Sequence, residues 1–309
     1  MDGVLVVDKP VGPTSHDIVA RVRRALGERR VGHAGTLDPG ASGVLVLMIG
    51  RATRLAPFLS AETKTYDAVV QLGVSTNTYD GAGRPNGPAY SGPWPTRDIV
   101  EATLEEFRGT QLQSPPPYSA KKIGGHRSYD LARRHERHGG EAVAPLAVQV
   151  STERVRMTSY ADGVVGLDVV CSAGFYVRTL AHDVGERLGT GAHLAALRRT
   201  RSGTFTLTQA RELASVECSR QAAEAGVTPM SHLLPALPAV TLTAGGTTLA
   251  SHGRDLGPHD CVPGADCERV FSPDAPLHPA VRLLTASGDL LAIARAVRPG
   301  ALHPSVVLK

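Results

Sequence analysis

The stretch that most constrains the fold is a glycine-rich loop that leads into an apolar run, GHAGTLDPGASGVLVLMIG at residues 32–50. Its second half, residues 44–49, contains no polar side chain, and such a run predicts a β-strand buried on both faces. Its first half carries one acidic residue, Asp38, and the proline that follows favours an extended or turn conformation for it. A lone carboxylate on a glycine-braced loop beside a core strand is either an ordinary Asp-Pro-Gly turn or a supported reacting group.

The composition is that of a globular protein with an excess of arginine. The 309 residues are 42% hydrophobic and 20% charged, which allows one large domain or a main domain with a small one. The net charge is only +4, but 28 arginines outnumber 5 lysines, and arginine both binds phosphates and stacks on bases. Basic residues cluster at 21–30, 121–127, 133–137 and 198–201. These clusters favour a polyanionic partner.

Several classes of protein are disfavoured by missing signals. The sequence has neither a signal peptide nor an apolar run of about 18 residues, so we expect a cytoplasmic protein without a membrane span. The spacing of His252, His259, Cys261 and Cys267 matches no common zinc-finger pattern, so no metal site is predicted. The phosphate-binding patterns GxxxxGK[ST] and GxGxxG are absent as well.

Periodicity predicts the elements around the loop. Apolar residues at helical spacing predict helices over 14–27 and 177–189, and alternation predicts a strand over 64–72. Residues 192–200 are also expected to form a short helix, with Leu194 and Leu197 inward and Arg198 and Arg199 outward.

The chain is expected to divide near residues 235–238. Beyond that point, short apolar segments separated by Gly and Pro predict a small β-rich domain over 239–309, after a main domain over 1–238. The basic, glycine- and histidine-containing residues 121–141 read as an insertion in the main domain.

Five blocks of sequence, in order, carry a family resemblance. They are GVLVVDKPVGPTSHDIVARVRR, VGHAGTLDPGASGVLVLMIGRATR, KTYDAVVQLGVSTNTYDGAG, FRGTQLQSPPPYSAKKIGGHRSYDLAR and CSAGFYVRTLAHDVGERLGTGAHLAALRRTRSG. Together they cover most of residues 3–203, and the chain resembles bacterial tRNA pseudouridine synthases of the TruB family. The resemblance implies an α+β catalytic domain, with a mixed, mainly antiparallel sheet and flanking helices, and a C-terminal domain that resembles the RNA-binding PUA type.

The resemblance also implies catalytic residues. Asp38 matches the family's essential aspartate, a nucleophile or a stabiliser of the positive sugar carbon while the base is detached. Arg178 matches the arginine that forms an ion pair with that carboxylate. Tyr66 matches the tyrosine that stacks on the target base and is a candidate for proton transfer. The residues alone favour an ordinary half-buried strand tyrosine for Tyr66 and a surface arginine at a helix start for Arg178, and only the resemblance reverses both interpretations.

Further positions are implied to bind RNA. His33 matches the histidine that the family inserts into the T-loop when the uridine flips out, and Leu197 matches a leucine lining the base pocket. Tyr176 lines the same pocket or the core. The remaining implied RNA-binding residues, in the insertion that takes the place of the family's RNA-gripping flap and in the last basic cluster, are Lys121, Lys122, Arg127 and Arg198.

The implied activity is isomerisation of uridine to pseudouridine at position 55 in the T-loop of tRNA, with no cofactor because nothing is oxidised. The expected partner is the tRNA T-arm, without a guide RNA or a membrane, and the expected state is a monomer. Two alternatives remain open. The chain could act chiefly as an RNA-binding or tRNA-folding protein, or it could isomerise uridine in another RNA.

Overall fold

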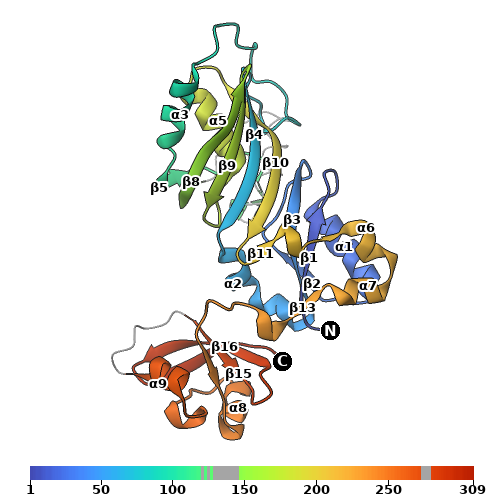
Figure 1. The fold of residues 1–309 in the computed structure, drawn as a ribbon, viewed down its shortest axis with the longest axis vertical. Helices are drawn as coiled ribbons and strands as arrows, with labels where there is room; N and C mark the ends of the chain where they lie inside the picture. The colour runs from blue at the N-terminus through green and yellow to red at the C-terminus, as the bar shows by residue number, and fades with distance from the viewer. Residues whose placement is uncertain (120–121, 124–125, 128–145, 273–279) are drawn as a thin grey trace.

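The computed structural model describes residues 1–119, 122–123, 126–127, 146–272 and 280–309. The molecule is elongated, with a large sheet above and a small sheet below in the view of Figure 1. Helices flank both sheets. The predicted α+β architecture is confirmed, and the large sheet is mixed and mainly antiparallel, as expected.

The large sheet has eleven strands and a main path in the order β12-β1-β3-β10-β4-β9-β8-β5. Strands β2, β11 and β13 pair with β3, β10 and β1 beside this path. The bounds are β1 (Gly3–Lys9), β2 (Val31–Ala34), β3 (Ala41–Ile49), β4 (Lys64–Leu72), β5 (Gly109–Gln113), β8 (Val148–Ala161), β9 (Val164–Cys171), β10 (Ala192–Ser202), β11 (Phe205–Thr206), β12 (Arg211–Glu212) and β13 (Val227–Pro229).

Strand β3 contains the predicted apolar run and is buried on both faces. It pairs with β1 along the full length of β1, from Gly3 opposite Ile49 to Lys9 opposite Gly43. Leu45 and Leu47 belong to the core under helices α1 (Ser15–Leu26) and α5 (Val177–Arg187). Their neighbours Val44 and Val46 belong to a second core under η1 (Gly50–Leu55) and α2 (Ala56–Ala61). An alternating strand would have exposed one of these sets, so the unbroken run follows from having helices on both faces.

Helices cover both faces of the large sheet. Helix α1 starts at a capping box between Thr14 and Asp17 and ends at Gly27, whose φ of 64° allows the left-handed cap. The elements are α1 (Ser15–Leu26), η1 (Gly50–Leu55), α2 (Ala56–Ala61), α3 (Arg97–Glu105), α5 (Val177–Arg187), η2 (Leu207–Gln209), α6 (Leu213–Cys218), α7 (Arg220–Ala225) and η3 (Met230–His232). Within the described ranges, no helix is both long and apolar enough to cross a membrane.

The expected helix over 192–200 is wrong, because these residues form strand β10. This strand lies between β3 and β4 and pairs with β4 from Ala192 to Ser202. Its register shifts between Leu194 and Ala196 and again after Arg199, and such bulges break the alternation by which a strand is recognised in sequence. Arg199 was expected to face outward but is only 1% exposed.

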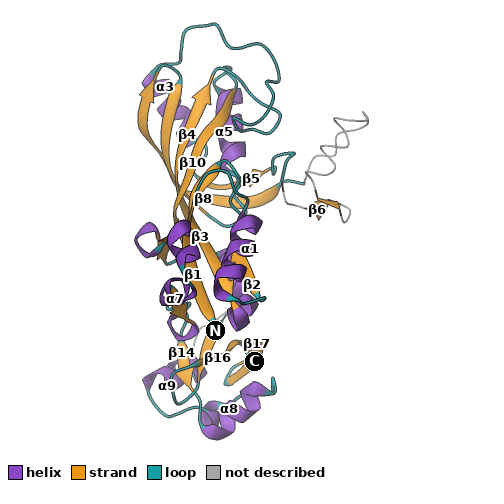
Figure 2. Cartoon of the chain, turned by 90° about the vertical axis from the view of Figure 1, so that its right-hand side faces the viewer, coloured by secondary structure: helices purple, strands orange, loops and turns teal. Residues whose placement is uncertain are grey.

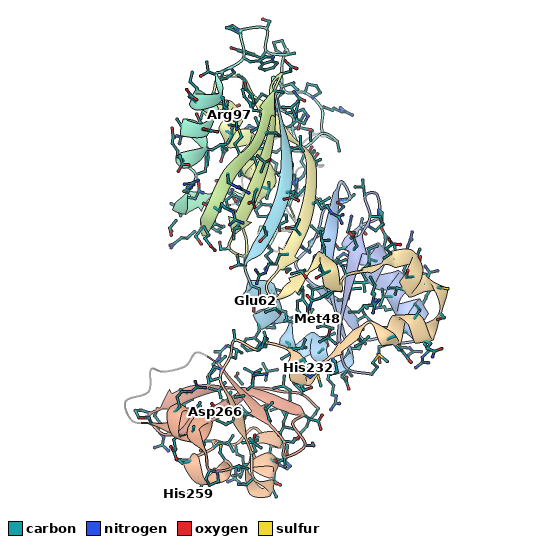
Figure 3. All side chains as sticks on the ribbon, viewed as in Figure 1. Met48, Glu62, Arg97, His232, His259 and Asp266 are labelled. Carbon is teal, nitrogen blue, oxygen red and sulfur yellow. The ribbon has the colours of Figure 1, made fainter. Side chains whose placement is uncertain are left out.

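The small sheet follows the order β14-β15-β16-β17 and has its own apolar core. Its elements are β14 (Ala239–Thr241), α8 (Ala244–Ser251), η4 (Pro258–Asp260), α9 (Ala265–Phe271), β15 (Val281–Leu284), β16 (Leu290–Arg298) and β17 (Ala301–Val307). Ile293 and Leu308 also join the core that contains Met48 of β3, labelled in Figure 3 at the junction of the two sheets. The two sheets therefore share buried apolar surface.

The predicted insertion over 121–141 falls mostly outside the described residues. What is described of it is the pairing of two short strands, β6 (Lys122–Ile123) and β7 (His126–Arg127). In Figure 2 this hairpin projects well away from the large sheet.

Candidate active site

Asp38 lies on the loop between β2 and β3, and this loop is tied to α1. The Ser15 hydroxyl donates to the Leu37 carbonyl and accepts from the Leu37 N–H, both at 2.9 Å. The Ala41 N–H donates to the Asp38 carbonyl at 3.0 Å and closes the turn. The Asp38 side chain keeps 42% of its surface exposed. The loop is thus fixed on both sides while its carboxylate faces solvent.

A buried lysine, Lys9, supports the same loop from β1. It is fully buried, and its ammonium donates to the carbonyls of Pro10 at 2.9 Å, Ala41 at 2.6 Å and Pro39 at 3.4 Å. Burial lowers the pKa of Lys9, and the Asp38 carboxylate partly opposes that shift. Sequence reasoning missed this role, although an isolated lysine at the end of an apolar strand is a signal for it.

The structure brings Arg178 and Asp38 together. Arg178 lies in the first turn of α5, and its Nε is 2.9 Å from Oδ2 of Asp38. The Nε–H does not point along this line, so the contact is an ion pair rather than an aligned hydrogen bond. Nη1 donates to the Thr78 carbonyl at 3.1 Å and lies 3.8 Å from Asp80, and Nη2 donates to the Tyr118 carbonyl at 3.0 Å. The guanidinium is therefore held on every side.

Tyr66 lies on β4. Lys64, two residues earlier on the same strand, lies on the same face. Tyr66 is 8% exposed, and burial raises the pKa of its phenol, while the nearby Arg199 guanidinium opposes the shift through charge and a hydrogen bond. Burial also lowers the pKa of Lys64 to about 8, and Arg199 adds to that effect. Cys171, opposite Lys64 on β9, has its thiol pKa raised to about 12 by burial. The phenol and the thiol are thus neutral near pH 7.

Four of these residues, Asp38, Lys64, Tyr66 and Arg178, line one pocket of about 230 Å³. The loop residues 35–38 form one wall and residues 174–178 another, while Lys64 and Tyr66 of β4 and Leu197 and Arg199 of β10 also line it. A carboxylate, an aromatic ring and several cations therefore face a cavity large enough for a planar base and open to solvent.

The predicted RNA-binding residues are distributed over the site and beyond it. Leu197 and Tyr176 line the pocket, and the Tyr176 backbone is fixed by two hydrogen bonds to the Gln113 amide. His33 lies on β2, partly buried, with its ring edge-on to His16 at 5.3 Å. Burial lowers the pKa of His33, and His16 lowers it further.

Of the basic residues predicted to bind RNA, Arg198 lies outside the pocket lining. Arg198 lies on the opposite face of β10 from Arg199 and donates to both carboxylate oxygens of Asp8, at 3.1 and 2.6 Å. Lys121 lies outside the described residues. For Lys122 and Arg127 the structure gives the backbone pairing alone. Their RNA contacts stay predictions.

Two family models match the chain. Residues 23–177 match the TruB family pseudouridylate synthase N-terminal domain, and residues 178–239 match the tRNA pseudouridylate synthase B C-terminal domain. Curated relatives named tRNA pseudouridine synthase B include those of Solibacter usitatus, 41% identical, and Gloeobacter violaceus, 42% identical. Both alignments cover 100% of this chain, and they cover 100% and 99% of the relatives.

Solved structures of an RNA–protein complex and of a multiprotein complex are similar as well. One, titled as an H/ACA RNP bound to a substrate RNA containing 2′-deoxyuridine, gives a TM-score of 0.71 at 25% identity. Another, a Cbf5-Nop10-Gar1 complex, gives 0.72 at 26% identity. Each match covers 99% of this chain and 85% of the other.

Proposed function

This chain belongs to the TruB family of pseudouridylate synthases, and from that membership and the pocket we propose that it isomerises a uridine of tRNA to pseudouridine. The target is position 55 in the T-loop. The observation that carries the proposal is the ion pair of Asp38 and Arg178 in the lining of a pocket that Tyr66 and Leu197 also line. Curated relatives that match essentially the whole chain at about 40% identity bear the name tRNA pseudouridine synthase B.

The placement of Asp38 supports its assignment as the reacting carboxylate. Its carboxylate is partly exposed at the pocket, while its backbone is fixed by Ser15 and Lys9 through their bonds to neighbouring residues. A fixed carboxylate can attack the reacting carbon or stabilise its positive charge while the base is detached. Arg178 keeps the carboxylate oriented.

Tyr66 is assigned to the base itself. A uridine that flips out of an RNA loop loses stacking worth a few kcal/mol, and an aromatic wall replaces part of it. We also assign to Tyr66 the transfer of the C5 proton. Burial keeps this phenol protonated near pH 7, although the Arg199 guanidinium opposes the shift, so the phenol releases its own proton to N1 of the base when its oxygen takes the proton from C5. His33, on the loop side of the site, is assigned to the gap left in the T-loop.

The remaining assignments concern organisation. We propose a catalytic domain over 1–238 with the RNA-gripping insertion at about 121–141, and a PUA-like RNA-binding domain over 239–309. We also propose that the protein acts as a cytoplasmic monomer without a guide RNA. The support is a difference in sequence identity. The chain is about 40% identical to the relatives named tRNA pseudouridine synthase B, but about 25% identical to the matched proteins of the H/ACA RNP and Cbf5-Nop10-Gar1 structures.

The likeness to those complexes favours one alternative, the same isomerisation on an RNA chosen by a guide. Purified protein and an unmodified tRNA transcript, with nothing else added, separate the two. Product at the T-loop uridine supports the proposed function, whereas product that appears only with added guide and partner proteins supports the alternative.

Replacing Asp38 tests the chemistry. Asp38→Asn is expected to abolish pseudouridine formation and to leave tRNA affinity within about threefold, because the side chain keeps its shape and loses one charge. Asp67→Asn is the matched control, since Asp67 is an exposed carboxylate on the other face of β4. Activity that persists in Asp38→Asn refutes the mechanism. Loss of binding in that variant instead favours an RNA-binding role.

A further inference from the structure

Two buried cations in the pocket, Arg199 and Lys64, form no ion pair with a carboxylate of the described residues. Arg199 is 1% exposed and Lys64 is 5% exposed. Within the same part of the chain, Asp38 and Asp80 lie within 4 Å of Arg178 instead, at 2.9 and 3.8 Å. Taking an unpaired charge out of water costs several kcal/mol, so the pocket retains these charges at a cost in stability.

Both cations are held by backbone carbonyls. Arg199 donates from Nε to the Val44 carbonyl at 2.7 Å and from Nη2 to the Gly35 carbonyl at 3.0 Å. The Lys64 ammonium donates to the carbonyls of Ser60, at 2.5 Å, and Glu62. Figure 3 labels Glu62 at the turn where α2 leads into β4. Carbonyls fix a cation without neutralising it, so the pocket keeps a net positive charge.

The two cations are also close to one another. A Cβ placed on Gly35 would lie 3.5 Å from Nη1 of Arg199 and 3.7 Å from Cε of Lys64. The positive charge of Arg199 contributes to the lowered pKa of Lys64. Both line the same pocket as Tyr66 and the Asp38–Arg178 pair. Such an arrangement is complementary to an anion that enters the pocket or forms within it.

The proposed reaction forms an anion at this place. When the N1–C1′ bond breaks, its electron pair stays with the pyrimidine and spreads onto O2 and O4, while C1′ becomes positive beside the Asp38 carboxylate. The new C5–C1′ bond then forms, C5 loses its proton, and N1 gains one, so that atoms and charge balance without any co-reactant. The pyrimidine therefore carries its negative charge only in the interval after the N1–C1′ bond breaks and before the C5–C1′ bond forms.

We propose that Lys64 and Arg199 form an anion-stabilising subsite that takes up the negative charge of the detached pyrimidine. This inference rests on the proposed function. It assigns to Lys64 and Arg199 the lowering of the energy barrier for breaking the N1–C1′ bond. Charge stabilisation that acts only in the transition state raises the rate without tightening substrate binding. A purely structural Lys64, which closes the end of α2 onto β4, would affect folding and not the response to the leaving base.

The test compares two leaving bases. Transcripts carry uridine or 5-fluorouridine at the target, and fluorine withdraws electrons, so the detached base is a more stable anion. Because fluorine replaces the C5 proton, both reactions are followed as single-turnover consumption of the N1-linked nucleotide. The variants are Lys64→Gln, which keeps an N–H donor for the Ser60 and Glu62 carbonyls, and Lys64→Met, which keeps chain length. Lys309→Met, at the exposed C-terminus, is the matched control.

With uridine, we expect both Lys64 variants to be slowed about 100-fold or more, the usual effect of losing one oxyanion donor, with tRNA affinity unchanged within about threefold. With 5-fluorouridine, the loss is expected to shrink about tenfold. An equal loss on both bases, or no loss on uridine, overturns the subsite. Wild-type turnover of the uridine transcript reports separately on the proposed function, and its absence would overturn both.

Discussion

Replacing Arg178 tests the geometry of the reacting carboxylate. Arg178→Met removes the ion pair to Asp38 and the two hydrogen bonds to the Thr78 and Tyr118 carbonyls. Breaking a buried, hydrogen-bonded charge pair from one side costs about 3–5 kcal/mol. Since 42% of the Asp38 side chain is exposed, water replaces part of the interaction, and we take the lower value, about 3 kcal/mol.

If that energy holds Asp38 in its reactive position, the rate of the chemical step falls roughly 100- to 200-fold. Binding of tRNA is expected to change little, because Arg178 is itself only 6% exposed. The assay is single-turnover pseudouridine formation with saturating enzyme, together with a filter-binding Kd. Circular dichroism then establishes that the variant is folded at the assay temperature.

The matched control is Arg187→Met, on the same helix. Arg187 pairs with Glu106, but both side chains are more than half exposed, and such pairs contribute about 1 kcal/mol or less. A rate for Arg178→Met within about threefold of wild type would refute the positioning role. A large loss of affinity with an unchanged rate at saturation would instead make Arg178 an RNA-binding residue.

Three further predictions concern the support of the pocket. Gly43→Ala should abolish or severely destabilise folding, because φ is 102° and a Cβ would collide with the Arg199 backbone on β10; a Tm within about 2 °C of wild type contradicts this. Lys9→Met should lower the free energy of unfolding by about 2–3 kcal/mol in urea titrations, since three carbonyls lose a buried donor, and an unchanged midpoint speaks against it. The lowered pKa of Lys64, about 8, means that the unfolded chain binds more protons between about pH 8 and 10.5, so stability rises with pH in that window by up to about 3 kcal/mol. Lys64→Met should lose this rise, and identical pH profiles would disprove the burial of a charged lysine.

The parts of the fold that follow from local pattern were predicted from the sequence. The apolar run of β3 and the alternation of β4 are strong signals because one side-chain period dominates each of them. Strand β10 was mistaken for a helix because its two bulges break the period and because its partners, β3 and β4, are distant in sequence. Tertiary pairing overrode local preference there.

The same error hid Arg199. In a helix, Arg198 and Arg199 both lie on one exposed side, but in a strand they point to opposite faces. Arg198 therefore pairs with Asp8 on one face while Arg199 enters the pocket on the other. The approach of Asp38 to Arg178 was implied by family resemblance alone, since no periodicity relates residues 140 positions apart. Lys64 was visible in sequence as the neighbour of Tyr66 on one strand face, but its burial was not.

The most direct measurement of the central claim is nucleotide-resolution mapping of pseudouridine in an unmodified tRNA transcript incubated with the purified chain alone. We expect one pseudouridine, at position 55 in the T-loop, with wild type and with Asp67→Asn, and none with Asp38→Asn. Modification by Asp38→Asn, or no modification of tRNA by the wild-type chain, would contradict the account.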